Sequence, residues 1–237
     1  MSDLHPILQR CHQGLIVSCQ APVDSPLHDR TVISAIAKAA VRRGAVGVRL
    51  DTPAHVEATR VRLPDTPIIG LWKQTLPGSD VYITPQFHHA EAIASAGADI
   101  IAIDATLRER PGGETFAEIA IRVRDELGKL VMADIDTLEA AIAAQAAGAD
   151  IIGTTLYGYT GETQHLTPPG FDLLEKMAKH LQVPIVCEGG IASPQMAQRA
   201  LELGADMVVV GTAITGIDLL VGAYTKAVDD VRSGSNI

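Results

Sequence analysis

The 237-residue sequence has few aromatic residues, few cysteines and no long apolar run. Aromatic residues make up 3% of the chain and hydrophobic residues 47%, so branched aliphatic residues and alanine must form the core. The three cysteines, Cys11, Cys19 and Cys187, lack the Cys-x-x-Cys spacing of zinc or redox sites, and we interpret the last two as buried apolar residues. No apolar stretch reaches the ~20 residues that cross a bilayer, and the N-terminus has no signal-peptide core. We therefore expect a cytoplasmic protein with no membrane partner.

Basic residues do not cluster anywhere in the chain, and its formal net charge is −9. A nucleic-acid groove requires concentrated lysine and arginine, so a nucleic-acid partner is excluded. The net charge does not exclude a phosphorylated ligand, because a few local cations or helix N-termini are enough to hold a phosphate.

A fourfold internal repeat is the strongest pattern in the sequence. Each copy reads as a helix end, a glycine turn and a short apolar strand, and the copies occupy residues 43–50, 96–104, 147–155 and 203–211. Four further apolar runs alternate with them, at residues 15–20, 67–73, 130–136 and 184–190. Eight strands, each followed by a helical pattern, predict an α/β fold. We expect a single-domain (β/α)8 TIM barrel of the phosphate-binding type over residues 1–237.

A doubly wound open sheet is the competing architecture, but it would place a glycine-rich phosphate loop after the first strand. Residues 18–26 contain no such loop, and the glycines cluster late in the chain. We also predict an extra extended segment at residues 81–85 and a closing helix after Asp218.

Polar residues end nearly every predicted strand, where (β/α)8 enzymes carry their active sites. In chain order they are Gln20, Arg49, Asp51, Lys73, Asp104, Asp134, Asp136, Thr154, Thr155, Glu188, Gly211 and Thr212. Lys73 follows an apolar run, so partial loss of hydration would lower its pKa and make it a candidate base or Schiff-base nucleophile. Glu188 is the candidate partner carboxylate. The alternative for Lys73 alone is a solvated lysine or an ion-pair partner.

Glycine-rich segments follow the seventh and eighth strands, at residues 189–193 and 211–215. Barrels frequently bind phosphate there through backbone N–H groups, so Gly189, Gly190, Gly211 and Thr212 are candidate phosphate-binding residues. Simple turn chemistry is the alternative.

Other polar residues carry weaker signals. Asp104 and Asp134 match no metal motif, and no strand-end histidine joins them, so we predict no metal site. We interpret His88 and His89 as a solvated pair at a helix start, and residues 157–160 as either a lid or a surface turn.

Several segments together resemble the N-acetylmannosamine-6-phosphate 2-epimerase family. They are GLIVSCQ (14–20), GAVGVR (44–49), PIIGLWK (67–73), DVYITP (80–85), AGADIIAIDAT (96–106), VMADIDTLEAA (131–141), GADIIGTTLYGYT (148–160) and the long segment 184–215. The resemblance covers nearly the whole chain in order.

The resemblance implies epimerisation at C2 of an N-acylated mannosamine 6-phosphate, in the breakdown of sialic acid, by a homodimer without metal or organic cofactor. It implies that Lys73 is the catalytic lysine and Glu188 its partner carboxylate. It also implies that Gln20, Arg49 and Asp134 surround the sugar.

The sequence departs from the family pattern in three places. Leu50-Asp51-Thr52 follows Arg49 where the family often has Ala-Asn, Tyr157 replaces the small residue that is more usual there, and Gly216 stands where the family usually has an arginine. The last departure removes a cation expected beside the phosphate.

Two other functions are consistent with the strand-end residues. One is another phosphosugar reaction, such as a pentulose-phosphate 3-epimerase or an aldolase that forms a Schiff base on Lys73. The other is a catalytically silent sensor of an amino-sugar phosphate.

Overall fold

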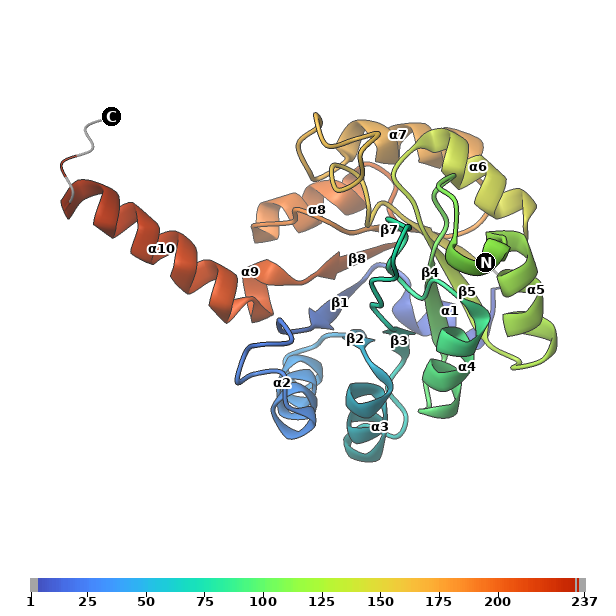
Figure 1. Cartoon of the computed structure of the whole chain (residues 1–237), viewed down its shortest axis with the longest axis horizontal. Coiled ribbons are helices and arrows are strands. Elements are labelled where there is room, and N and C mark those ends of the chain that lie inside the picture. Colours follow the sequence, from blue (N-terminus) through green and yellow to red (C-terminus); the bar gives the residue numbers. More distant parts are fainter. Residues whose placement is uncertain (1–3, 233, 235–237) are drawn as a thin grey trace.

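Eight parallel strands form a closed barrel in chain order, which confirms the predicted fold class. The computed structural model describes residues 4–232 and 234 (Figure 1). The strands are β1 (Gly14–Cys19), β2 (Gly47–Asp51), β3 (Ile68–Leu71), β4 (Ile100–Asp104), β5 (Leu130–Asp134), β6 (Ile151–Gly153), β7 (Ile185–Cys187) and β8 (Met207–Val210). Branched aliphatic residues dominate them because both faces of each strand are buried, one in the barrel and one under the helices.

Helices surround the barrel on its outside (Figure 1). They are α2 (Arg30–Arg42), α3 (Pro53–Arg62), α4 (Phe87–Ser95), α5 (Phe116–Asp125), α6 (Leu138–Ala146), α7 (Phe171–His180) and α8 (Pro194–Glu202), with a 3-10 turn η1 (Pro111–Gly113) before α5. Several begin at a side chain that accepts first-turn amide protons, as Asp29 does for α2 and Thr115 does in the capping box of α5.

The four copies of the repeat share one backbone feature, a glycine with positive φ. Their glycines, Gly44, Gly97, Gly148 and Gly204, all have φ between 87° and 104°. This left-handed conformation ends the preceding helix and turns the chain into the next strand, and glycine adopts it without steric cost. The sequence repeat therefore reflects a repeated turn.

A short N-terminal helix that the sequence did not reveal, α1 (Pro6–Cys11), closes the bottom of the barrel. Its buried Leu8 and Cys11 pack against inward-facing residues such as Ile16, Ile100 and Met207. All three cysteines are buried, as predicted for Cys19 and Cys187. The lower barrel is thus a packed apolar core, and the polar chemistry is confined to the opposite end.

The extended segment predicted after the third strand is confirmed. Lys73 and Ile83 form an isolated antiparallel bridge, and the amides of Gln74 and Thr84 donate to the carbonyls of Tyr82 and Trp72. This ladder places Lys73 and the half-buried Tyr82 at the barrel mouth. Nearby, the prediction of a solvated histidine pair is wrong for His89, which is buried and forms a T-shaped ring contact with Trp72.

The prediction of a closing helix is correct for the secondary structure and wrong for the packing. After β8 come the short α9 (Thr212–Thr215) and the long α10 (Ile217–Arg232). Figure 1 shows α10 leaving the barrel instead of covering it, and none of its residues is buried. Among the residues that the structure describes, no helix has the length and apolarity needed to cross a membrane.

Candidate active site

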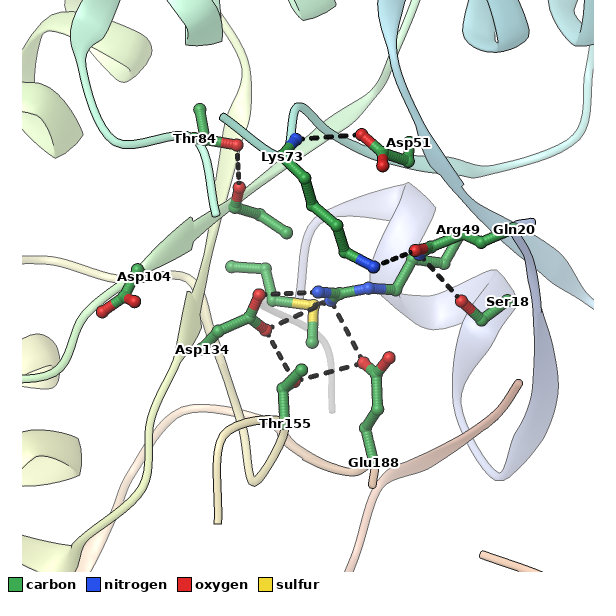
Figure 2. A network of polar contacts seen from close by, with 12 residues as sticks. Ser18, Gln20, Arg49, Asp51, Lys73, Thr84, Asp104, Asp134, Thr155 and Glu188 are labelled. Carbon is green, nitrogen blue, oxygen red and sulfur yellow. Dashed lines mark hydrogen bonds and ion pairs between the residues drawn. The ribbon is translucent and has the colours of Figure 1, made fainter. Parts of the chain in front are cut away.

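The site lies where alternate residues of the strands point into the barrel mouth. Side chains two positions apart along a strand share a face, so the apolar interior residues Ile69, Met132 and Val186 are followed by polar ones on the same side. Figure 2 shows the resulting cluster of Gln20, Arg49, Asp51, Lys73, Asp134, Thr155 and Glu188. The structure therefore brings together most of the strand-end residues that the sequence singled out.

Arg49 forms the floor of the site. Its side chain is 1% exposed, and its Nη1 and Nη2 donate to Oδ1 and Oδ2 of Asp134 at 3.1 and 2.6 Å. Nη1 also lies 3.1 Å from Oε2 of Glu188. Burial alone would lower the pKa of Arg49, but the two carboxylates outweigh it and hold that pKa above its ordinary value.

Glu188 is the carboxyl group that titrates near neutrality. It is 9% exposed, and burial raises its pKa from 4.5 to about 7. Asp134 pushes the pKa of Glu188 the same way, while Arg49, Thr155 and Lys73 oppose the shift. A carboxyl group poised near pH 7 can exchange protons with a substrate in either direction.

Lys73 lies across the site from Glu188. Its Nζ donates to Oε1 of Gln20 at 2.5 Å, and Gln20 donates in turn to Ser18 Oγ at 3.0 Å. Lys73 is exposed at the barrel mouth, yet its ammonium is folded inward among the strand ends (Figure 2). Loss of hydration there lowers the pKa of Lys73, Arg49 lowers it further, and Asp51 opposes the shift.

Asp51 fixes the backbone that carries the lysine. Its Oδ1 accepts the Lys73 amide proton at 2.9 Å. The next residue, Thr52, has φ 73° and ψ 144°, a conformation that residues with a side chain rarely adopt. Asp51 is buried, and burial raises its pKa.

Thr155 was only one of two threonines at the end of the sixth strand, and the structure distinguishes them. The hydroxyl of Thr155 points into the mouth and lies 2.7 Å from Asp134 Oδ1 and 3.2 Å from Glu188 Oε2. Thr154, the predicted substrate-binding residue, is fully buried. Its hydroxyl donates to the Glu188 carbonyl at 2.8 Å and accepts the Glu188 amide proton at 3.1 Å. Thr154 therefore supports the backbone of Glu188. The alternation of inward residues through Gly153 is the signal that identifies Thr155.

Asp104 does not join the cluster. Its Oδ2 accepts from Arg108 at 2.7 Å and its Oδ1 from Thr106, so it organises its own loop and points away from Arg49 (Figure 2). Asp136 likewise accepts from Thr160 at 2.7 Å. Within residues 4–232 and 234, no three histidine, cysteine or carboxylate side chains are grouped as metal ligands.

Two glycine segments border the mouth beside β7 and β8. Gly189 and Gly190 have φ of 93° and 71°, and a Cβ at Gly190 would come within 2.5 Å of Pro168, so these turns require glycine. Gly211 precedes α9, whose first amides, of Thr212 and Ala213, have no acceptor among the described residues. Gly216 ends α9 and offers no side chain there.

Comparison with known proteins identifies the family of the chain that carries this cluster. The family described as "Putative N-acetylmannosamine-6-phosphate epimerase" matches residues 33–230. The chain belongs to this epimerase family. A family protein of Synechococcus elongatus is 66% identical over 228 residues, which cover 96% of this chain and 98% of the relative. One of Thermosynechococcus vestitus is 62% identical over 214 residues, covering 90% and 92%.

A solved structure extends the family match to three dimensions. The N-acetylmannosamine-6-phosphate 2-epimerase of Clostridium perfringens matches with a TM-score of 0.89 at 36% identity, covering 94% of this chain and 96% of that one. A thiamine phosphate pyrophosphorylase of Pyrococcus furiosus matches with a TM-score of 0.59 at 18% identity, which shows the shared fold alone. The family is thus one member of a widely used barrel architecture.

Proposed function

We propose that the protein interconverts N-acylmannosamine 6-phosphate and N-acylglucosamine 6-phosphate by moving the proton at C2, in amino-sugar and sialic acid catabolism. The observation that carries this proposal is the arrangement of Lys73, an amine with a lowered pKa, opposite Glu188, a carboxyl group that titrates near 7. Membership of the epimerase family supports the substrate class.

The chemistry of the sugar defines what each group must do. The C2 proton is acidic only when C1 is a carbonyl, so the pyranose ring opens first. Neutral Lys73 then removes the C2 proton, and an enolate forms with its charge on the oxygen of C1. The planar enolate turns about the C2–C3 bond, so that its opposite face meets Lys73, which returns the proton there. Glu188 takes the hydroxyl proton of C1 during ring opening and passes it to the ring oxygen O5 as the C1–O5 bond breaks, so that Glu188 is ionised again before the C2 proton is removed; ring closure reverses these transfers. The buried Arg49 stabilises the developing negative charge without reorganisation, and Gln20 and Asp134 hold the acylamino group and hydroxyls.

The phosphate would lie over Gly189, Gly190, Gly211 and Thr212. The free first amides of α9 and the open backbone at the two glycines supply donors for an anion there. Because Gly216 replaces the arginine of the family, these donors would hold the phosphate through the backbone.

Incubation with N-acetylmannosamine 6-phosphate, followed by proton NMR, tests the function. We expect the signals of N-acetylglucosamine 6-phosphate to grow until the two epimers reach equilibrium. Bound but unchanged substrate would instead indicate a sensor. Covalent fixation of the substrate by borohydride would indicate an imine on Lys73, and thus an aldolase. Either result would overturn the proposal.

The pH dependence should report both titrating groups. The mechanism needs neutral Lys73 and ionised Glu188, so protonation of either stops it. We expect log kcat/KM to fall with a slope of about 1 while only one of the two groups is being protonated. Below both pKa values, of which that of Glu188 is about 7, the slope should be about 2. The Glu188→Gln variant should be slower by ~10²–10⁴, and its profile should lack the one unit of slope that Glu188 contributes to the wild type.

The substrate phosphate, with its pKa near ~6, titrates identically with both enzymes, so the difference between the two profiles isolates Glu188. A slope of the variant equal to that of the wild type would remove Glu188 from the acid–base chemistry.

We also propose that the protein is a homodimer in which α10 packs on the barrel of a second copy. A regular (β/α)8 barrel has a helix after its eighth strand to cover the wall. Here that helix projects outward (Figure 1), and α8, the helix that precedes β8, buries only Ala200. One side of α10 carries an apolar stripe at alternating spacings of four and three, formed by Ile217, Val221, Tyr224, Val228 and Val231, each 52–81% exposed.

A second copy is the occupant that this geometry favours. It presents the same uncovered wall and the same outward helix, so a twofold axis lets each helix complete the other barrel. Burying one valine or leucine side chain contributes roughly 1.5–3 kcal/mol, and a reciprocal exchange doubles the number buried.

A further inference from the structure

The hydroxyl of Thr155 occupies a position between two carboxylates that share one guanidinium. Oδ1 of Asp134 and Oε2 of Glu188 each face the same two groups, Arg49 Nη1 and Thr155 Oγ1. The four contacts measure 3.1, 3.1, 2.7 and 3.2 Å and form a closed cycle (Figure 2). Thr155 is the only uncharged residue of this cycle, and its hydroxyl links the carboxylates of Asp134 and Glu188 on the side opposite Arg49.

This cycle holds one oxygen of Glu188 and leaves the other available. Oε2 is fixed by Arg49 and Thr155, whereas Oε1 points away from Thr155 (Figure 2) and accepts no hydrogen bond from the described residues. A carboxylate that is held at one oxygen can present the second in a defined direction. A free carboxylate would rotate and lose that orientation.

The two residues before Thr155 help to maintain the contacts of this cycle. A Cβ at Gly153 would come within 2.6 Å of Met132 Cε and 3.2 Å of Thr155 Oγ1, so a side chain there would displace the Met132 methyl group and crowd the Thr155 hydroxyl. Thr154 fastens the backbone of Glu188 through two hydrogen bonds. Three consecutive residues, 153–155, therefore position Glu188 from its backbone to its carboxylate.

We propose that Thr155 is a positioning residue that orients Glu188, so that its Oε1 meets the C1 oxygen of the substrate. This inference rests on the proposed epimerisation. Thr155 acts through Glu188 and has no contact of its own with the reacting atoms. Its single proton is shared between two acceptors, and the shorter bond goes to Asp134, so the hydroxyl stabilises the ionised form of Glu188 only in part.

Three variants test the proposal. Thr155→Val keeps the shape and removes the hydroxyl, and Thr155→Ser restores it. Thr160→Val is the matched control, because the buried Thr160 likewise donates to a carboxylate, Asp136, outside the cluster. For each we would measure kcat, KM and the pH profile by proton NMR, with thermal unfolding as a check on the fold.

For Thr155→Val we expect kcat to fall about tenfold while KM changes less than about twofold. The Glu188 limb of the profile should move to higher pH by roughly half a unit, because a donor to the carboxylate is lost. The groups that remain around Glu188 are Arg49, Asp134 and Lys73, and none of them changes. Thr155→Ser should restore both values, and Thr160→Val should leave the limb in place.

The outcomes separate this inference from the function itself. An active wild type with an unchanged profile and kcat in Thr155→Val would overturn the role of Thr155 and leave the epimerase intact. A shift of the limb in Thr160→Val as large as in Thr155→Val would assign the effect to general loosening, which also overturns it. An inactive wild type would overturn the epimerase, and with it this inference.

Discussion

Replacing Lys73 with alanine should abolish epimerisation and, with it, the exchange of the C2 hydrogen with solvent deuterium. Lys73 is the group whose lowered pKa suits proton removal beside the substrate, and loss of a general base costs typically ~10²–10⁴ in rate. Because one residue both removes and returns the proton, no partial reaction should survive. Proton NMR in deuterated buffer measures turnover and label at C2 in one experiment.

The control for this variant is Lys176→Ala, an exposed lysine on α7, which should retain wild-type turnover. Lys73 is itself exposed, so its removal should leave the melting temperature nearly unchanged. Retained exchange in Lys73→Ala, with or without net epimerisation, would show that another group removes the C2 proton.

Placing charge on the apolar stripe of α10 should dissociate the dimer. In the double variant Val221→Glu, Val228→Glu, two carboxylates would enter the interface that we propose, and an unpaired buried charge costs several kcal/mol. Light scattering should give twice the 25.0 kDa chain mass for the wild type and a single chain mass for the variant. Its melting temperature should also fall, because the barrel wall beside α8 would lose its cover.

The matched control is Thr225→Glu, which adds a charge to the same helix off the stripe and should leave the dimer intact. A monomeric wild type would mean that α10 folds onto its own barrel or stays exposed. A dimer that survives the double variant would place the interface elsewhere. Either result would overturn the helix exchange.

The sequence predicted the barrel fold and the polar C-terminal ends of its strands because the patterns that indicate them are local. Apolar runs of strand length, glycines that end helices in the left-handed conformation and polar residues at strand ends each depend on a few neighbouring residues. Parallel strands in a closed barrel then place all their C-terminal ends at one rim. For this reason Gln20, Arg49, Lys73, Asp134 and Glu188 could be grouped without coordinates, and the structure does bring them together.

Other features depended on exact strand boundaries, which sequence patterns locate only to within a few residues. A shift of one residue reverses which side chains face the barrel. Thr154 was therefore predicted to bind the substrate, although the structure turns its hydroxyl to the Glu188 backbone and leaves Thr155 in the mouth. In the same way, His89 is buried and its neighbour His88 is exposed.

By itself, then, the sequence determined the order of strands and helices, the barrel and the polar residues at its rim. Only the tertiary structure decided how these residues pair: the cycle of Arg49, Asp134, Thr155 and Glu188, the burial that raises the Glu188 pKa to about 7, and the outward course of α10. The physical reason is that local periodicity records which side of an element is apolar. It does not record which distant element, or which chain, that side meets.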